Sequence, residues 1–555
     1  MLEAQVHSSL LTFLRTQPPA LSQPAWPHHL TLARLVARAL RLQRSALIQT
    51  AAMPTTYGMS YLTALLLWSH DGVVVVPETQ QTRFLDEFQR LQGHLKTHKQ
   101  VQRIGAQLGD WVKGKGADDA SVSHCSSPRS QVANGRTHPP TLLLTSPAVW
   151  LSDRLGAQHQ FPPGLPTLID GVDDLEAWAR AALTRTLLPS DWQELAQALP
   201  EDAQQIIQIA RQLGQAFCDR PRNPYDCYPL EPEQQAAIDQ LSQDLKHHLN
   251  PLLPPRWQTF LQQWHQPIGQ LRWATVEGSA ERIAPAASPT AGVRFHVAPM
   301  QLAPQLASLW QQQPTVFMGR FLGLERQDGR FWRDRLGLGD VTTVKFAPQR
   351  QPELIQLYVP ERLAFPNHPA FRDQLLNQIL RLCRGGMLGQ RHGRQHPPEW
   401  ISPLKRPVVL VVEDTPLRTQ VSTTLAAEFG SCVQLETPAL TPKSILVCGW
   451  DFWQFQQDHL PPPQLLIIAT LPLPSMENPL VAAQVQQLKR QRQDWFQGYL
   501  LPIALQRLQR AVLPVRDRQG VVALLDNRVN HRSYGRAIFT ALEPYARINY
   551  IDFVA

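Results

Sequence analysis

The stretch from Ile48 to Leu67, IQTAAMPTTYGMSYLTALLL, has the residue types and order of a phosphate-binding loop. A short apolar lead-in is followed by turn-prone residues, then Gly58-Met59-Ser60, then an apolar run typical of a helix. A strand, a tight turn and a helix N-terminus in this order present free backbone N–H groups to an anion. In the Walker A pattern, G-x-x-x-x-G-K-[ST], a lysine precedes the hydroxyl residue, but Met59 stands there and the first glycine is missing. Alone, the stretch fits either a phosphate loop without its cation or an ordinary strand–turn–helix.

Asp170 is a second candidate, because it ends an apolar strand in the segment PTLIDGVDDLEAW, 166–178. An acidic residue at such a strand tip holds nucleotide-bound Mg²⁺ in P-loop enzymes. The alternative is a solvated carboxylate that begins the next helix. A phosphate loop upstream and a strand-end aspartate downstream form the expected pair, so their order favours the functional interpretation.

The composition describes a folded chain with a basic surface. At 555 residues it is too long for one core and should form two to four domains. A hydrophobic content of 43% with 18% charged residues excludes a disordered chain. The formal charge of +8 favours an anionic partner, nucleic acid first, although such an excess spread over a large surface can also serve only solubility.

Other function classes have little support. No apolar run approaches the length of a bilayer span, and the N-terminal segment lacks the basic start and apolar core of a signal peptide, so we expect a cytoplasmic protein without membrane contact. The six cysteines are scattered without a C-x-x-C pair, which argues against a disulfide framework or a structural zinc site.

The elements that must position the two candidates alternate between strand and helix. Continuous apolar runs predict buried strands at 72–77, 142–144, 167–170, 407–412, 444–447, 465–469 and 520–525. Helical patterns at 30–44, 78–91, 416–429 and 480–491 lie between or before them, and this alternation predicts parallel sheets. The pattern from 175 to about 264 is helical and Gln-rich, strand-like segments return at 271–297, and 114–137 and 385–394 read as loop or linker.

With these motifs in place, the chain resembles the DinG/XPD-like DNA helicases of helicase superfamily two. IDGVDDLE resembles the family's I-D-E-A-H-x-L-E box, and 448–460 its G-T-x-S-F-W-E-G-V-D segment. The closing block, 501–535, resembles a Q-x-x-G-R-x-x-R helix followed by L-D-x-R-x-x-x-x-S-Y-G, the most specific of the matches. Further matches, in the family's order, lie at 73–85, 314–338, 357–371 and 466–483.

The resemblance implies an α/β fold of two RecA-like P-loop domains, parallel sheets flanked by helices, with a helical arch-like insertion in the first. The expected division is 1–174 for the N-terminal part of the first domain, 175–265 for the insertion and 266–345 for the return of the first domain. A connector over 346–406 and the second, helicase C-terminal domain over 407–555 complete it.

The resemblance also implies site residues and ligands. ATP would lie between the domains against Thr55, Thr56, Gly58, Met59 and Ser60, with Mg²⁺ at Ser60 and Asp170. Catalytic roles would fall to Asp170, Gln509 and Arg516, and single-stranded DNA would cross both domains. Relatives with an iron–sulfur cluster use four cysteines between the Walker boxes, where this chain has only Cys125, so no cluster is expected.

The departures from the family pattern fall on chemical positions. The Walker A lysine is Met59, the Walker B glutamate is Gly171 and the histidine of that box is Asp173. The S-A-T core of the coupling motif is Met318-Gly319-Arg320, and the central Gly-Arg of the last motif is Val512-Leu513. ATP and Mg²⁺ binding should therefore be weakened, and efficient hydrolysis is not expected.

Three functions remain open from the sequence. The first is a pseudo-helicase that binds single-stranded DNA, using segments such as 381–394 and 489–492 and aromatic residues such as Trp495; Trp453 fits core packing better. The second is a divergent active helicase of DNA repair or replication in which Lys113, Lys115 or Arg320 replaces the lost lysine. The third is a protein–protein module of a repair complex. A monomer is expected in each case.

Overall fold

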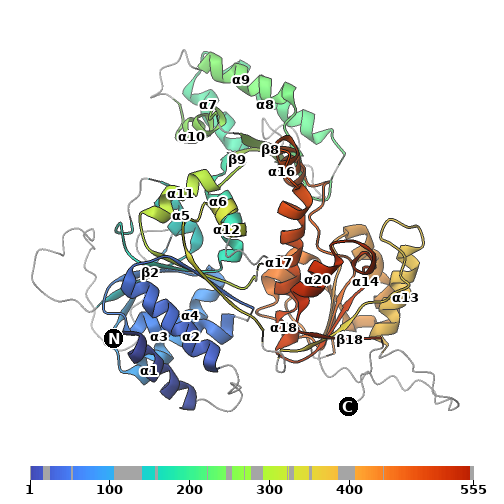
Figure 1. The fold of residues 1–555 in the computed structure, drawn as a ribbon. Coiled ribbons are helices and arrows are strands. Elements are labelled where there is room, and N and C mark those ends of the chain that lie inside the picture. The colour runs from blue at the N-terminus through green and yellow to red at the C-terminus, as the bar shows by residue number, and fades with distance from the viewer. Residues whose placement is uncertain are drawn as a thin grey trace, which may run out of the picture. The chain divides into compact units, whose positions relative to one another are not determined.

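The computed structural model describes the chain in segments, and its contacts divide it into two compact units (Figure 1). The described residues are 2–16, 26–51, 54–105, 140–156, 160–221, 223–245, 253–267, 269–276, 292–321, 323, 330–348, 353–384, 407–441 and 443–549. Unit 1 comprises Met1–Ala182, Ala303–Phe321 and Glu325–Ala347, and unit 2 comprises Leu183–Leu302, Leu322–Leu324 and Pro348–Ala555. The expected loop at 114–137, the linker at 385–394, Cys125, Lys113 and Lys115 lie outside the described residues.

Unit 1 is built on a seven-stranded sheet in the order β11-β1-β10-β5-β2-β4-β3, with every pairing parallel. Every residue of the central strands β1, β10, β5 and β2 is buried, which accounts for their continuous apolar runs. The strands are β1 (Ala46–Thr50), β2 (Gly72–Val75), β3 (Gln100–Ile104), β4 (Thr141–Thr145), β5 (Thr167–Asp170), β10 (Thr315–Gly319) and β11 (Thr342–Phe346).

Helices cover both faces of this sheet. Figure 1 shows α1 to α4 gathered on one face, where their apolar sides form a core with residues of β1, β2 and β10 such as Ile48, Val74 and Met318. On the other face, Trp150 of α5 stacks on Trp310 of α11. The helices are α1 (Leu2–Thr16), α2 (Trp26–Leu42), α3 (Pro54–Leu67), α4 (Glu78–Leu95), α5 (Pro147–Leu155), α6 (Val172–Leu183), α11 (Ala303–Gln311) and α12 (Arg330–Leu336).

Unit 2 contains a second seven-stranded parallel sheet in the order β14-β15-β13-β16-β17-β12-β18. Its strands are β12 (Ile355–Tyr358), β13 (Val408–Val411), β14 (Val433–Leu435), β15 (Ile445–Cys448), β16 (Leu465–Ile468), β17 (Val521–Leu524) and β18 (Tyr545–Ile548). Its helices are α13 (Phe371–Cys383), α14 (Thr415–Phe429), α15 (Trp450–Gln456), α16 (Pro479–Arg490), α17 (Leu501–Ala511), α18 (Leu513–Arg516), α19 (Arg528–His531) and α20 (Gly535–Leu542). The predicted α/β fold with two parallel sheets is thus confirmed. β12 pairs with β17 and β18, so the predicted connector contributes a strand to the sheet.

The insertion also belongs to unit 2 and combines helices with a small antiparallel sheet, β6-β9-β8-β7. Its elements are β6 (Arg185–Leu187), α7 (Pro189–Ala198), α8 (Ala203–Cys218), β7 (Cys227–Pro229), α9 (Pro232–Leu245), α10 (Pro255–Trp264), β8 (Gln270–Val276) and β9 (Val293–Pro299). The sequence prediction of a helical insertion over 175–265 was incomplete, because β6 and β7 are three residues long and show no alternation between their helical neighbours. The pairing of β8 and β9 with these strands places the return to unit 1 at α11.

Candidate functional site

The connection between β1 and α3 is short. β1 ends at Thr50 and α3 begins at Pro54, so only residues 51, 52 and 53 join them. Only the first four N–H groups of a helix lack an acceptor within it. The N–H groups of Gly58, Met59 and Ser60 lie beyond those four, so they belong to the helix's own hydrogen bonds. The sequence predicted free N–H groups at Gly58, Met59 and Ser60. In the structure these residues lie within α3, so their N–H groups are not free to bind an anion.

Two of the residues expected to bind nucleotide, Met59 and Ser60, have buried side chains. Ser60 is fully buried, and its Oγ lies 2.9 Å from Nδ1 of His29 on α2. Burial lowers the pKa of His29 to about 4, which keeps the imidazole neutral. Met59 is 3% exposed and packs in the core between α1–α4 and the sheet. Thr55 and Thr56 lie in the first turn of α3, and their side chains are outside the described part of the chain.

Asp170, at the end of β5, is 4% exposed and accepts two hydrogen bonds from α3. The Tyr57 hydroxyl donates to Oδ1 at 3.0 Å and the Tyr61 hydroxyl donates to Oδ2 at 2.8 Å. The two tyrosines are four residues apart, which places them on one face of the helix. Burial raises the pKa of Asp170, while the two hydroxyls and the positive charge of Arg320 act in the opposite direction.

These residues do not fit a magnesium–nucleotide complex. Mg²⁺ requires open oxygen ligands in near-octahedral geometry and keeps several waters. Both oxygens of Asp170 instead face tyrosine hydroxyls in a buried pocket, and Ser60 pairs with His29. Within the described residues, no group of three or more His, Cys, Asp or Glu is placed to hold a metal ion.

Two residues near Asp170, Gly171 and Asp173, also differ from the family pattern. Gly171, at the position of the family's glutamate, has φ +110°, and a Cβ there would lie 2.8 Å from the Trp178 ring, so a side chain is strained on both counts. The Asp173 carboxylate accepts from the backbone N–H of Arg320 at 2.6 Å and of Phe321 at 3.1 Å. The carboxylate therefore joins the first turn of α6 to the two residues that follow β10, and it stabilises the fold there.

In unit 2, Arg516 is a buried structural residue. It is 3% exposed, and its guanidinium donates to four backbone carbonyls. Nη1 reaches the oxygens of Glu353 (3.0 Å) and Pro544 (3.1 Å), and Nη2 those of Leu542 (2.7 Å) and Glu543 (3.0 Å). Burial lowers its pKa to about 10. Gln509, the other predicted catalytic residue of this block, lies on α17 and is 7% exposed.

The closing block holds its shape through Asp526 and Gly535. Asp526 is fully buried, pairs with Arg528 at 2.6 Å and accepts from the N–H of Leu471 at 2.8 Å. A Cβ at Gly535 would lie 1.9 Å from the Val529 carbonyl oxygen, so only glycine fits there. The family's L-D-x-R and S-Y-G residues therefore act here as packing and pairing groups.

The predicted aromatic residues of unit 2 differ in accessibility. Trp453 is fully buried and its Nε1 donates to the Ala511 carbonyl at 3.3 Å, so it packs in the core. Trp495 is half-buried, and Lys489 Nζ lies 5.0 Å from its ring centroid. Phe455, in the segment resembling S-F-W-E-G, is 74% exposed.

The sequence reasoning missed Tyr57 and Tyr61, which donate to Asp170, and His29, which pairs with Ser60. A signal for the tyrosines was present in their spacing of four residues around Gly58-Met59-Ser60. Nothing local marked His29, because its contact with Ser60 spans 31 residues of sequence.

Two parallel sheets with a buried carboxylate at a strand end define the class: a two-domain, RecA-like helicase fold. Residues 450–545 match the helicase C-terminal domain family. Over 134 residues the chain is 29% identical to the ATP-dependent DNA helicase YoaA of Haemophilus influenzae, covering 23% of this chain and 21% of that relative. The match thus spans about a fifth of the relative's length.

Solved structures resemble the whole chain. Xpd4 of S. tokodaii has a TM-score of 0.55 at 10% identity, covering 94% of this chain and 99% of its own. A structure described as an XPD helicase gives 0.54 at 12% identity with the same coverage. Together with the helicase C-terminal domain, they confirm the resemblance to DinG/XPD-like helicases of superfamily two. None of the helices in the described segments has the length and apolarity to cross a membrane.

Proposed function

We propose that this protein is a helicase homologue that binds nucleic acid, single-stranded DNA in particular, and does not turn over ATP efficiently. The observation that carries the proposal is the Asp170 corner, by which we mean Asp170 with the hydroxyls of Tyr57 and Tyr61. There two tyrosine hydroxyls take the carboxylate oxygens that a magnesium ion would need, and the following residue, Gly171, is a glycine that tolerates no side chain.

The magnitude of the expected loss is large. Removing a general base costs about 10²–10⁴-fold in rate. An arginine finger is worth about 10³–10⁵-fold in related phosphoryl transfers. Arg516, the surviving arginine of the last motif, is held by four backbone carbonyls, so it is not free to reach a phosphate.

Nucleic-acid binding is supported by charge and by the kind of relative. The chain carries a formal charge of +8, and the relative YoaA is named a DNA helicase. Exposed basic residues beside a half-buried tryptophan, Lys489, Arg490 and Arg492 with Trp495, suit phosphate contact and base stacking. We expect affinity for single-stranded DNA to fall steeply with added salt.

The test is ATP hydrolysis by the purified full-length protein with and without single-stranded DNA, alongside DNA binding. We expect DNA binding with ATP turnover at the background rate, unchanged in Asp170→Asn. Asp174→Asn is the matched control, a neighbouring carboxylate on α6 outside the tyrosine pair. DNA-stimulated hydrolysis that Asp170→Asn abolishes and Asp174→Asn leaves intact would overturn the loss of turnover.

One observation favours the alternative, a divergent active helicase of repair or replication. Arg320 is 6% exposed, and its charge acts on both Asp170 and Tyr57, so a cation does exist near the corner. If Arg320 replaces the lost lysine, Arg320→Gln will abolish hydrolysis while DNA binding persists. If Arg320 only neutralises Asp170, the same change will lower stability and leave a background rate.

A further inference from the structure

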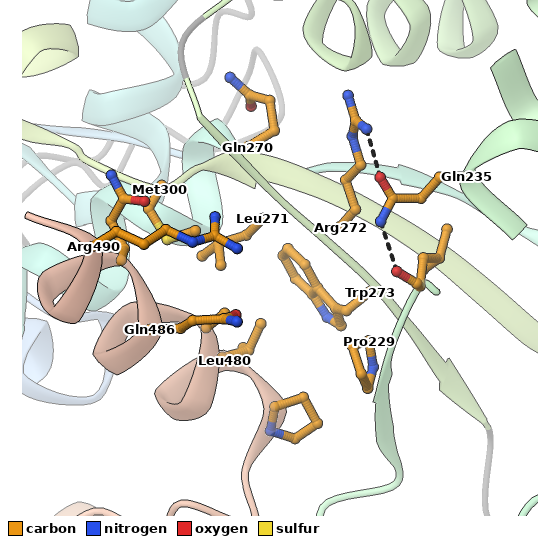
Figure 2. Close-up of a pocket in the computed structure, with 14 residues that line it drawn as sticks. Pro229, Gln235, Gln270, Leu271, Arg272, Trp273, Met300, Leu480, Gln486 and Arg490 are labelled. Carbon is orange, nitrogen blue, oxygen red and sulfur yellow. Dashed lines mark hydrogen bonds between the residues drawn. The ribbon is translucent and has the colours of Figure 1, made fainter. Parts of the chain in front are cut away.

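A pocket of about 240 Å³ lies between the insertion sheet and α16, both within unit 2 (Figure 2). Leu271 and Trp273 of β8 and Met300, just after β9, form the insertion side. Leu480 and Ala483 of α16 form the other side and pack against the same apolar cluster. The pocket is smaller than the roughly 300–1,000 Å³ of sites for drug-sized ligands, so it suits one flat ring system.

Trp273 lines this pocket with a small part of its ring, since it is 8% exposed and belongs to the apolar cluster against which Leu480 and Ala483 pack. One face of its indole stacks on His296 at 5.0 Å between centroids and 16° between planes. His296 is itself fixed, since Nδ1 lies 2.9 Å from the Thr186 hydroxyl and Nε2 2.8 Å from that of Thr275. Burial lowers the pKa of His296 to about 4, so the stack is uncharged at neutral pH. Figure 2 shows Trp273 directed toward α16, whereas Arg272 points the other way, to Gln235.

The rim of the pocket carries groups that read base edges and phosphates. Gln486 and Gln487 contribute amides, which offer a donor and an acceptor side by side and can pair with the edge of a base. Gln270 also lines the pocket, but its Oε1 accepts from Gln263 Nε2 at 2.7 Å. Arg490, at the end of α16, is exposed, and in Figure 2 its side chain reaches toward Leu271 and Met300. Arg272 is committed elsewhere, donating to Gln235 Oε1 at 2.7 Å and to the Trp264 carbonyl at 2.9 Å.

The pocket continues into a basic and aromatic surface. Beyond Arg490 the chain runs through exposed Arg492 to Trp495, whose ring lies under Lys489. A single strand whose phosphates follow these cations would have its bases within reach of the pocket mouth. Aromatic rings and cations in alternation are the usual platform for unpaired nucleic acid.

We propose that this pocket receives one unstacked base of a single strand, with the edge of the base on Gln486 and Gln487, beside the exposed part of Trp273, and the adjoining phosphate on Arg490. The inference rests on the proposed binding of single-stranded DNA and adds a site to it. Because the walls come from the insertion and from α16, a bound base bridges the insertion and the second sheet's domain.

The test uses the full-length protein and two sets of short oligothymidylates. In one set a 2-aminopurine occupies each position in turn, and in the other an abasic site does. At one position we expect the fluorescence of 2-aminopurine to change on binding and the abasic strand to bind about tenfold more weakly, as for the loss of one stacked base.

Ala483→Phe fills the pocket from α16 and should abolish both the fluorescence change and the base preference, while abasic strands still bind. Ala426→Phe makes the same substitution at an exposed position of α14, outside the pocket and outside the 489–495 surface, and should change neither. Should Ala483→Phe fail to fold, Gln487→Leu removes one amide without added bulk and should weaken the base preference alone.

The outcomes separate the two proposals. Tight binding of every strand with no base preference, or a signal that survives Ala483→Phe, overturns the pocket and leaves single-strand binding in place. No binding of any strand overturns both.

Discussion

Asp170 in unit 1 and Asp526 in unit 2 are both buried carboxylates at the carboxyl end of a parallel strand, yet their partners differ in kind. Asp526 pairs with the guanidinium of Arg528, a residue of the family's closing pattern, and accepts from the backbone N–H of Leu471. Asp170 faces the hydroxyls of Tyr57 and Tyr61, which belong to no family motif. In unit 2 the carboxylate is thus bonded by a residue of the motif itself, whereas in unit 1 it is bonded by two tyrosines that the motif match did not single out.

The largest expected effect tests whether Arg516 is structural. Arg516→Met leaves four carbonyls without their donor, at about 1–3 kcal/mol each where no water replaces it, so we expect unit 2 to lose about 5 kcal/mol. Hydrogen–deuterium exchange of β18 and α20 measures the loss. Arg518→Met, which removes an exposed arginine two residues away, should change little. Unaltered protection in Arg516→Met would contradict the structural role.

A pair of matched substitutions tests the comparison directly. Asp526→Asn breaks a buried ion pair and should cost about 4 kcal/mol in unit 2. Asp170→Asn should cost only about 1 kcal/mol in unit 1, because burial already disfavours the charged form of that carboxyl. Exchange rates in β17 and β5 report the two changes separately. Equal losses of stability in the two variants would contradict the proposed difference between the Asp526 ion pair and the Asp170–tyrosine contacts.

A further expected effect is an acid sensitivity confined to unit 1. The pKa of His29 falls from 6.5 to about 4 on folding, so between these pH values the unfolded chain binds a proton that the folded chain does not. Stability is fully present above pH 6.5 and decreases by about 3 kcal/mol as pH falls to 4. In His29→Gln, α3 should lose this pH dependence in hydrogen exchange. The exposed His98→Gln should keep it.

Much of the fold could be predicted because its central strands are uniformly apolar. The runs at 72–77, 167–170, 407–412 and 520–525 became β2, β5, β13 and β17, since strands buried on both faces leave a continuous signal. The insertion sheet escaped prediction for the opposite reason. Two of its strands span three residues, and their pairing depends on partners far along the chain, such as Leu187 with Phe295.

The candidate site could be located from the sequence but not described. Motif order singled out Met59, Ser60 and Asp170, and the substitutions there predicted weakened phosphate chemistry. The identity of what replaced it depends on contacts between distant segments, such as Tyr61 with Asp170 across 109 residues. The sequence does not fix the first residue of α3 to within one turn. That turn decides whether the N–H groups of Gly58, Met59 and Ser60 are free or bonded within the helix.

The burial of Met59 limits which side chains this position can take. A lysine restored at this position would put an ammonium group among the apolar side chains of α1–α4, a burial that costs several kcal/mol without a partner. A lysine that reached a phosphate from this position would therefore also require a longer loop before α3 and the displacement of Tyr57 and Tyr61 from Asp170. The residues of this connection are thus coupled, so a single substitution at Met59 would not turn it into a phosphate-binding loop.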